Sequence, residues 1–273
     1  MTIGGYKVNS IDKAAELKQQ AKELRKAALT MIHAAQSGHP GGSLSAADIM
    51  AALFFHEMKL DPANPKWEGR DRFVLSKGHV CPILYASLIL RGFMDKQELY
   101  NLRKYKSKLQ GHPDMKSTPG VDISTGSLGQ GLSTAVGMAL GLKRDDMDNR
   151  VFCLVGDGET QEGQIWEAVM TAVKYELDNL VVFIDNNRIQ NDSFCDEVMP
   201  VKDLAEKFKA FGCAVYAVDG HRMEDIIAVL DQVRENRTGK PAVVVAATVK
   251  GKGVSYMEDV PGWHGMAPDD ELF

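Results

Sequence analysis

Residues 151–158 read VFCLVGDG and residues 179–189 read NLVVFIDNNRI, and these two stretches decide the fold. Each is a short, continuous apolar run that ends in Gly, Asp or Asn. Two more apolar runs follow at 213–218 and 241–248. Amphipathic stretches alternate with these runs, at 163–176, 201–211 and 223–236. This alternation predicts βαβ units and a parallel sheet covered on both faces. We therefore expect an α/β fold with a doubly wound, mostly parallel sheet flanked by helices.

The chain before these strands is expected to be helical. Apolar side chains in residues 10–35 recur at spacings of three and four, and the run ends at Ser-Gly-His-Pro-Gly-Gly, residues 37–42. Further helices are predicted at 46–57 and 81–91.

Residues 251–273 are rich in Gly, Pro and Asp and have no periodicity, so we expect a loop or an interface arm there. No linker or repeat divides the chain, which predicts a single domain over residues 1–273.

Composition narrows the class of protein. The 273 residues are 44% hydrophobic and 25% charged, which is typical of a soluble globular chain. The net charge of −5 predicts no broad basic surface for nucleic acid or an anionic membrane. We expect a cytoplasmic protein, because neither a leader nor a long apolar span is seen. The four cysteines have no Cys-x-x-Cys spacing and are expected to be buried thiols: Cys81, Cys153, Cys195 and Cys213.

Polar residues follow two consecutive strands of the predicted sheet. Asp157 offers a carboxylate after the first, and Asn187 offers an amide oxygen after the second. Ligands of open α/β sheets bind outside the carboxyl ends of the strands. One carboxylate with neutral oxygens makes half a Mg²⁺ site, which a diphosphate would complete. Either turn alone would be ordinary, but the pair predicts a metal-bridged diphosphate, whereas neither G-x-G-x-x-G nor a P-loop is present.

Five motifs carry a resemblance to a known family. Gly-Asp-Gly at 156–158 followed by Asn-Asn at 186–187 resembles the thiamine-diphosphate binding motif. Four further motifs resemble successive transketolase signatures: Ser-Gly-His-Pro-Gly at 37–41, Leu-Ser-Lys-Gly-His at 75–79, Gly-His-Pro at 111–113 and Thr-Gly-Ser-Leu-Gly-Gln-Gly at 125–131. The resemblance extends from about residue 20 to residue 264. It implies the thiamine-diphosphate-binding fold and, within that group, a transketolase.

The resemblance also implies a role for individual residues. Mg²⁺ would be held by Asp157, Asn187 and the backbone carbonyl of Ile189. The substrate-facing histidines would be His39, His112 and His264. The positions that resemble contacts to the diphosphate, to the rings or near the cofactor are His79, Gly126, Leu128, Gly158, Glu162, Asn187, Lys250 and His264. Among these, the N–H of Gly158 with His79 and His264 would contact the diphosphate, and Gly126 with Leu128 would hold the two rings.

Histidines suit this chemistry, because cleaving a ketose needs a hydroxyl deprotonated and an alkoxide stabilised near neutral pH. The other three histidines are expected to be structural. His33 and His56 lie in apolar helical stretches and are predicted to be packing or surface residues. His221 follows Asp-Gly and is predicted to serve a turn or a helix start.

A partner chain is implied as well. Transketolases supply the glutamate that activates the cofactor from a second domain, whereas this chain ends at Phe273, and Glu159 and Glu162 belong to the diphosphate side. We therefore predict the N-terminal subunit of a split transketolase, an α2β2 enzyme of the pentose phosphate pathway. It would transfer a two-carbon ketol unit from a ketose phosphate to an aldose phosphate. The C-terminal subunit would supply the activating glutamate and the sugar-phosphate anchors.

Three departures bear on specificity. Ser127 stands where many transketolases have proline, and Asn-Asp-Ser at 191–193 replaces a more apolar continuation. Residues 41–45 differ from the longer transketolases, which suggests a ketose transferase for a modified or branched sugar. Two alternatives stay open. One is the α subunit of a thiamine-diphosphate 2-oxo acid dehydrogenase, which the histidine contexts disfavour. The other is a non-catalytic module that binds the cofactor.

Overall fold

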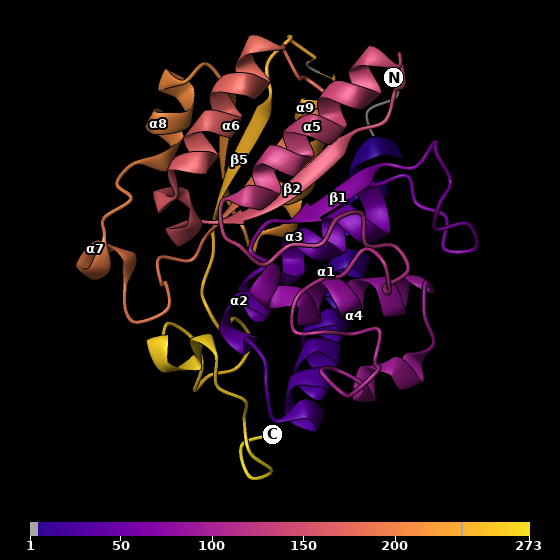
Figure 1. The fold of residues 1–273 in the computed structure, drawn as a ribbon, viewed down its shortest axis with the longest axis vertical. Helices are drawn as coiled ribbons and strands as arrows, with labels where there is room; N and C mark the ends of the chain where they lie inside the picture. The colour runs from indigo at the N-terminus through magenta and orange to yellow at the C-terminus, as the bar shows by residue number, and fades with distance from the viewer. Residues whose placement is uncertain (1–4, 236) are drawn as a thin grey trace.

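The fold is built on a parallel sheet. A computed structural model describes residues 5–235 and 237–273, and within them one sheet contains five strands, all parallel (Figure 1). The strands are β1 (Arg72–Leu75), β2 (Val151–Gly156), β3 (Leu180–Asn186), β4 (Ala214–Asp219) and β5 (Ala242–Ala247). Their order across the sheet is β1-β2-β3-β5-β4. The predicted α/β fold with a parallel sheet is confirmed.

Helices cover both faces of the sheet. One face carries α1 (Gly5–Ala35), α3 (Ala47–Ala52), α4 (Cys81–Arg91) and α9 (Met223–Glu235). The other carries α5 (Gln130–Arg144), α6 (Gly163–Lys174) and α8 (Leu204–Ala210). Two short helices, α2 (Pro40–Ser45) and α7 (Cys195–Val198), lie beyond the strand ends. The N-terminal helices therefore form one layer of the same α/β arrangement.

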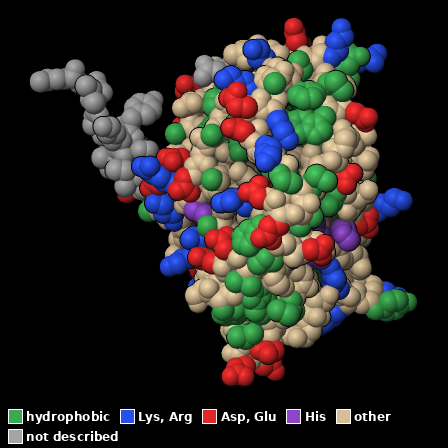
Figure 2. All heavy atoms as spheres, turned by 90° about the vertical axis from the view of Figure 1, so that its left-hand side faces the viewer, with side chains coloured by type: hydrophobic (Ala, Val, Ile, Leu, Met, Phe, Trp, Pro, Cys, Tyr) green, Lys and Arg blue, Asp and Glu red, His purple; other side chains and the backbone are tan. Residues whose placement is uncertain are grey.

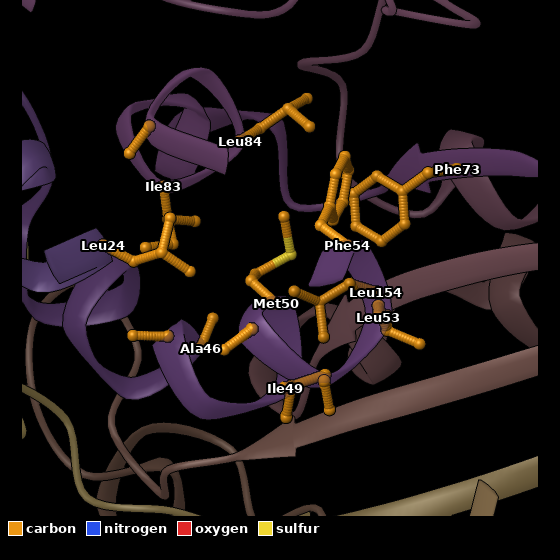
Figure 3. Packing of buried hydrophobic residues seen from close by; sticks show 14 of the residues in the cluster. Leu24, Ala46, Ile49, Met50, Leu53, Phe54, Phe73, Ile83, Leu84 and Leu154 are labelled. Atoms are coloured by element: carbon orange, nitrogen blue, oxygen red, sulfur yellow. The ribbon is translucent and has the colours of Figure 1, made fainter. Parts of the chain in front are cut away.

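Alternation along the strands fills two cores. In β2, Phe152 and Leu154 face the α1 side, whereas Val151, Cys153 and Val155 face the α5 side. Figure 3 shows how Leu24, Met50 and Ile83, from three helices, point toward one another, with Leu154 of β2 to their right beside Leu53. Each such fully buried side chain contributes about 1.5–3 kcal/mol to folding. The continuous apolar runs of the sequence are thus explained by a sheet that is buried on both faces.

Some expectations about elements were wrong. Residues 40–45 form the buried helix α2, not a break, because Pro40 occupies its first turn, where a missing N–H costs nothing. The predicted helix over 46–57 is confirmed, but only its first part is α-helical: α3 is followed by a π-helical turn, η1 (Leu53–Glu57). Strand β4 is only partly covered, since it lies at the edge of the sheet. Strand β1 and helix α5 were not predicted at all.

The C-terminal segment, residues 251–273, packs on the helical layer. It contains turns and one 3₁₀ turn, η5 (Pro261–His264). Met257 and Trp263 form a small core with Leu44 of α2. His33 of α1 stacks on Phe273 with ring centroids 4.0 Å apart, which agrees with a packing role for that histidine. The loop character is as expected, whereas a role as an interface arm stays a prediction.

The described surface and thiols agree with the composition. All four cysteines are buried and free. On the face drawn in Figure 2, basic and acidic side chains are interspersed. Within residues 5–235 and 237–273, none of the helices combines the length and the apolar character that a membrane span requires.

A close contact between α5 and the end of β1 gives a test of the fold. A Cβ at Gly131 would lie 2.5 Å from the Cα of Ser76, whereas a Cβ at Gly137, on the same helix, would meet nothing within 4 Å. We expect Gly131→Ala to lower the free energy of unfolding by about 1–3 kcal/mol. Gly137→Ala should raise it by about 0.5–1 kcal/mol, since alanine is the better helix former. Urea unfolding measures both, and equal shifts would contradict this packing.

Candidate active site

The two predicted metal-binding turns meet at one edge of the sheet. Strands β2 and β3 are neighbours, and Gly156 is in register with Asp185, so the turns that follow them lie side by side. A pocket of about 420 Å³ opens there. Nine of the predicted site residues line it: His79, Leu128, Asp157, Gly158, Glu162, Asn187, Ile189, Lys250 and His264. Residues from six separate parts of the chain are thus gathered at the carboxyl ends of the strands.

Asp157 is a buried carboxylate. Its Oδ1 accepts a hydrogen bond from the Gly158 N–H at 2.8 Å, and its Oδ2 accepts one from the Arg188 N–H. Burial, and then the nearby carboxylate of Asp185, raise the pKa of Asp157 to about 6. Among the described residues it forms no salt bridge. A cation beside Asp157 would therefore offset the cost of its burial, and the carboxylate has lone pairs left to bind one.

Asn187 and Ile189 lie on the next turn. The Asn187 side chain accepts from the Ile189 N–H at 3.2 Å and donates to Asp185 at 3.1 Å. The Ile189 carbonyl accepts from Lys250 Nζ at 2.7 Å and keeps a second lone pair. One carboxylate, one amide oxygen and one carbonyl fit a hard cation such as Mg²⁺. This set has a single acidic side chain, and no cluster of three or more His, Cys, Asp or Glu suited to a metal is found over residues 5–235 and 237–273.

Three of the predicted histidines form a triangle. The ring centroids of His39, His79 and His264 lie 5.1, 5.4 and 5.3 Å apart. His39 precedes α2, His79 lies in the 3₁₀ turn η2 (Gly78–Val80) and His264 lies in the 3₁₀ turn η5. Lys250 Nζ is 2.7 Å from His264 Nδ1.

These histidines are held in the neutral form. Burial is the main cause, and it lowers the pKa of His39 to about 4, of His79 to about 2 and of His264 to about 3. The positive charges of Lys250 and Lys77 lower the pKa of His264 further. A neutral imidazole offers one donor and one acceptor. Within the described part of the chain, His39 Nδ1 is buried without a hydrogen-bond partner, and His39 lies against His79 and His264 without itself lining the pocket.

His112 and Gly126 lie beside the pocket and not in its lining. A Cβ at Gly126 would be 3.1 Å from the His112 ring, so the two predicted residues are adjacent. Arg103 donates to Ser37 Oγ at 2.9 Å and packs against Gly111. It therefore links the segment before His39 to the segment before His112. Burial and then the charge of Arg103 lower the pKa of His112.

A buried ion pair at the base of the pocket was not predicted from the sequence. Lys77 Nζ donates to Asp185, whose side chain is 0% exposed. Asp185 also accepts from Ser45 Oγ at 2.6 Å, from Thr248 Oγ1 and from Asn187. An aspartate inside the apolar run NLVVFID was the available signal, because an unpaired carboxylate is not tolerated there.

His221 does more than end a turn. Its Nδ1 lies 2.8 Å from Asp48 Oδ2, and its Nε2 accepts from the Val249 N–H at 2.8 Å. This ring therefore holds the backbone directly before Lys250. A role for His221 beyond the turn could not be predicted, because Asp48 is distant in the sequence.

Comparison with known proteins decides the family. Residues 17–272 match the family model described as transketolase, thiamine diphosphate binding domain. The chain belongs to the transketolase family. It has a TM-score of 0.89 and 36% identity with the crystal structure of transketolase from Campylobacter jejuni, covering 94% of this chain and 41% of that one. The likeness to that transketolase thus spans nearly all of this chain but less than half of the other.

Two curated relatives of transketolase type match over nearly their whole length. The 6-deoxy-6-sulfo-D-fructose transketolase subunit SqwG of Clostridium sp. (strain MSTE9) is 44% identical, covering 94% of each chain. An apulose-4-phosphate transketolase subunit from Phocaeicola vulgatus is 41% identical, covering 94% of this chain and 91% of that relative. The predicted identity as the N-terminal component of a split transketolase, and hence as part of a transferase, is confirmed, and the 2-oxo acid dehydrogenase alternative is disfavoured.

Proposed function

We propose that this chain forms the diphosphate half of the active site in a two-subunit transketolase. The reaction is the transfer of a two-carbon ketol unit from a ketose phosphate to an aldose phosphate, as in the pentose phosphate pathway. The observation that carries the proposal is the convergence of Asp157, Asn187, His79 and His264 on one pocket at the ends of β2 and β3. Thiamine diphosphate supplies the nucleophilic carbon when it is bound.

Different residues of the pocket would hold the metal, the diphosphate and the rings of the cofactor. Asp157, Asn187 and the Ile189 carbonyl would hold Mg²⁺, which would fix the diphosphate beside His79 and His264. The Gly158 N–H donates to Asp157 Oδ1 at 2.8 Å, and it would form a second, shared hydrogen bond to the diphosphate. Leu128, 37% exposed, would offer an apolar wall for the rings, and Gly126, beside the His112 ring, would hold them as well. Glu162 and Lys250 lie at the rim and at the metal side, respectively.

Neutral histidines would handle protons at the substrate. His39 has an unpaired Nδ1 among the described residues and lies against His79 and His264, so it can accept a proton from a ketose hydroxyl. His112, next to Gly126 on the open side, can donate to a developing alkoxide. Their low pKa values leave them unprotonated at neutral pH. We infer that His39, His112 and His264 orient the donor ketose and move its protons.

The partner would complete the enzyme. The two glutamates that line the pocket, Glu159 and Glu162, belong to its diphosphate side. The glutamate that activates the cofactor would therefore come from a C-terminal transketolase subunit. That partner would also supply the sugar-phosphate anchors. We propose an α2β2 assembly, and the four free, buried thiols are consistent with a reducing, cytoplasmic setting.

His112 provides a test that separates the substrate side from the cofactor side. His112→Ala should leave the Kd for thiamine diphosphate within about 2-fold and lower kcat/KM for the donor ketose by about 10²-fold, the usual size of a general acid–base contribution. Calorimetry and a coupled assay with the partner subunit measure the two. His56→Ala, in η1 of the helical layer, is the control. Loss of cofactor binding in His112→Ala would show that this histidine belongs to the cofactor site.

The proposal itself is tested by titrating thiamine diphosphate with Mg²⁺ into the chain alone and into its mixture with the C-terminal subunit. We expect tight binding of the cofactor in the mixture. A turnover assay of the same mixture, with a series of ketose phosphates and a sulfonated ketose as donors, would then find the substrate. Binding without turnover of any donor would support the non-catalytic alternative. An absence of binding in both samples would overturn the proposal.

A further inference from the structure

Glu159 is a buried carboxylate in the lining of the pocket. The proposed mechanism gives this side chain no role. It follows Asp157 and Gly158 in the 3₁₀ turn η4 (Gly158–Gln161), and it is 4% exposed. Its side chain points back under the turn, because one of its oxygens accepts from the Gly156 N–H at 3.0 Å. No lysine or arginine forms a salt bridge with it among the residues described here.

Three separate segments donate to this one carboxylate. Oε1 accepts from Ser76 Oγ at 2.5 Å and from the Gly129 N–H at 2.9 Å, and Oε2 accepts from the Gly156 N–H. Ser76 follows β1, Gly129 precedes α5 and Gly156 ends β2. Gly129 has no side chain of its own to cap α5, so Glu159 also places negative charge at the start of that helix.

Each donor adjoins residues of the proposed cofactor site. Gly156 directly precedes Asp157, the proposed metal ligand. Gly129 follows Leu128, the proposed wall for the rings. Ser76 leads through Lys77 into the turn of His79. Because all three bonds end on one side chain, the distances between these segments are fixed by Glu159.

We propose that Glu159 is a positioning residue that sets the metal-side turn, the ring-side loop and the His79 turn at the spacing that thiamine diphosphate requires. This inference rests on the proposed function, because the three segments are those assigned to the cofactor. The carboxylate acts through two backbone N–H groups and the Ser76 hydroxyl, and it needs no contact with the cofactor. Sequence patterns do not predict this role, since a glutamate in Gly-Asp-Gly-Glu reads as a solvent-facing turn residue.

Glutamine is the informative replacement. All three partners are donors, and a glutamine has only one acceptor oxygen. If that oxygen serves Ser76 and Gly129, the new NH₂ group faces the Gly156 N–H; if it serves Gly156, the NH₂ group faces the Gly129 N–H. In either orientation one buried backbone N–H loses its acceptor, although the size of the side chain is unchanged.

The experiment uses the full chain in two arms. Glu159→Gln is compared with wild type and with Glu235→Gln, which makes the same charge change at an exposed position of α9. In the first arm, hydrogen exchange is followed without cofactor. We expect exchange to rise by about 10-fold in peptides covering 126–131 and 156–158 and to stay unchanged in β4 and α9. A merely destabilised protein would exchange faster everywhere.

In the second arm, calorimetry measures thiamine diphosphate binding with Mg²⁺. Glu159→Gln should weaken binding by about 10-fold, and Glu235→Gln should not change it. Ser76→Ala removes one bond but keeps the carboxylate, so it should weaken binding by about 3-fold and serves as the deciding variant if Glu159→Gln does not fold. Wild-type affinity in both variants, or uniform exchange changes, would overturn the inference. If the wild type itself bound no cofactor, the proposed function would fail, while the exchange arm would still decide whether Glu159 fixes these loops.

Discussion

Replacing Asp157 with asparagine is expected to weaken magnesium-dependent binding of thiamine diphosphate by at least about 100-fold. Asp157 is the only carboxylate of the proposed metal set, and the neutral oxygens of Asn187 and Ile189 carry too little charge to hold Mg²⁺ alone. Calorimetry with Mg²⁺ measures the loss. Binding of the cofactor within about 3-fold of wild type would contradict the metal assignment.

The same substitution should leave the cofactor-free chain folded. The pKa of Asp157, about 6, lies above its ordinary value of 3.8, so ionisation destabilises the empty chain as the pH rises from about 4 to above 6. Removing that charge at pH 7 returns up to about 3 kcal/mol, and the lost acceptor for one backbone N–H costs about 1–3 kcal/mol. Thermal unfolding should therefore show little net change. Asp196→Asn, at the exposed partner of Arg188, is the matched control.

Replacing Lys77 with methionine is expected to lower the free energy of unfolding by about 3–5 kcal/mol, because it leaves a buried carboxylate without its cation. Lys77 is 3% exposed and Asp185 is 0% exposed, so water screens the attraction between the two charges only weakly. Urea unfolding of the chain measures the effect. A loss below about 1 kcal/mol would mean that the pair is solvated and that it adds little to stability.

A second variant distinguishes the charge from the packing. Adding Asp185→Asn to Lys77→Met removes the uncompensated charge. Ser45 and Thr248 donate to different oxygens of Asp185, so one hydroxyl can still donate to the remaining oxygen and the other can accept from the new NH₂ group. The double variant should recover at least about half of the lost stability. If it is no more stable than Lys77→Met, the loss comes from the missing aliphatic chain.

Much of the fold was predictable because it depends on local patterns. Strands β2, β3 and β5 are continuous apolar runs, and the turns after β2 and β3 carry Asp157 and Asn187, so a diphosphate site at one edge followed from the parallel arrangement. The family resemblance then named the histidines, and His39, His79 and His264 do converge.

What escaped prediction depends on contacts between distant segments. Strand β1 has four residues and follows a polar stretch, so its apolar signal is too short to read. Helix α5 carries glycines at 131, 137 and 141, which weaken a helical pattern. Lys77 and His221 have partners 108 and 173 residues away, and Glu159 binds Ser76 and Gly129 at separations of 83 and 30 residues. No spacing rule links such pairs.

The central claim is that this chain holds the diphosphate half of a transketolase active site and needs a second subunit for turnover. The most direct measurement is ketol transfer from xylulose 5-phosphate to ribose 5-phosphate, with thiamine diphosphate and Mg²⁺, by the isolated chain, by the isolated C-terminal partner and by the two mixed. We predict turnover in the mixture only, abolished there by Asp157→Asn. Turnover by the isolated chain, or undiminished turnover with Asp157→Asn, would contradict this claim.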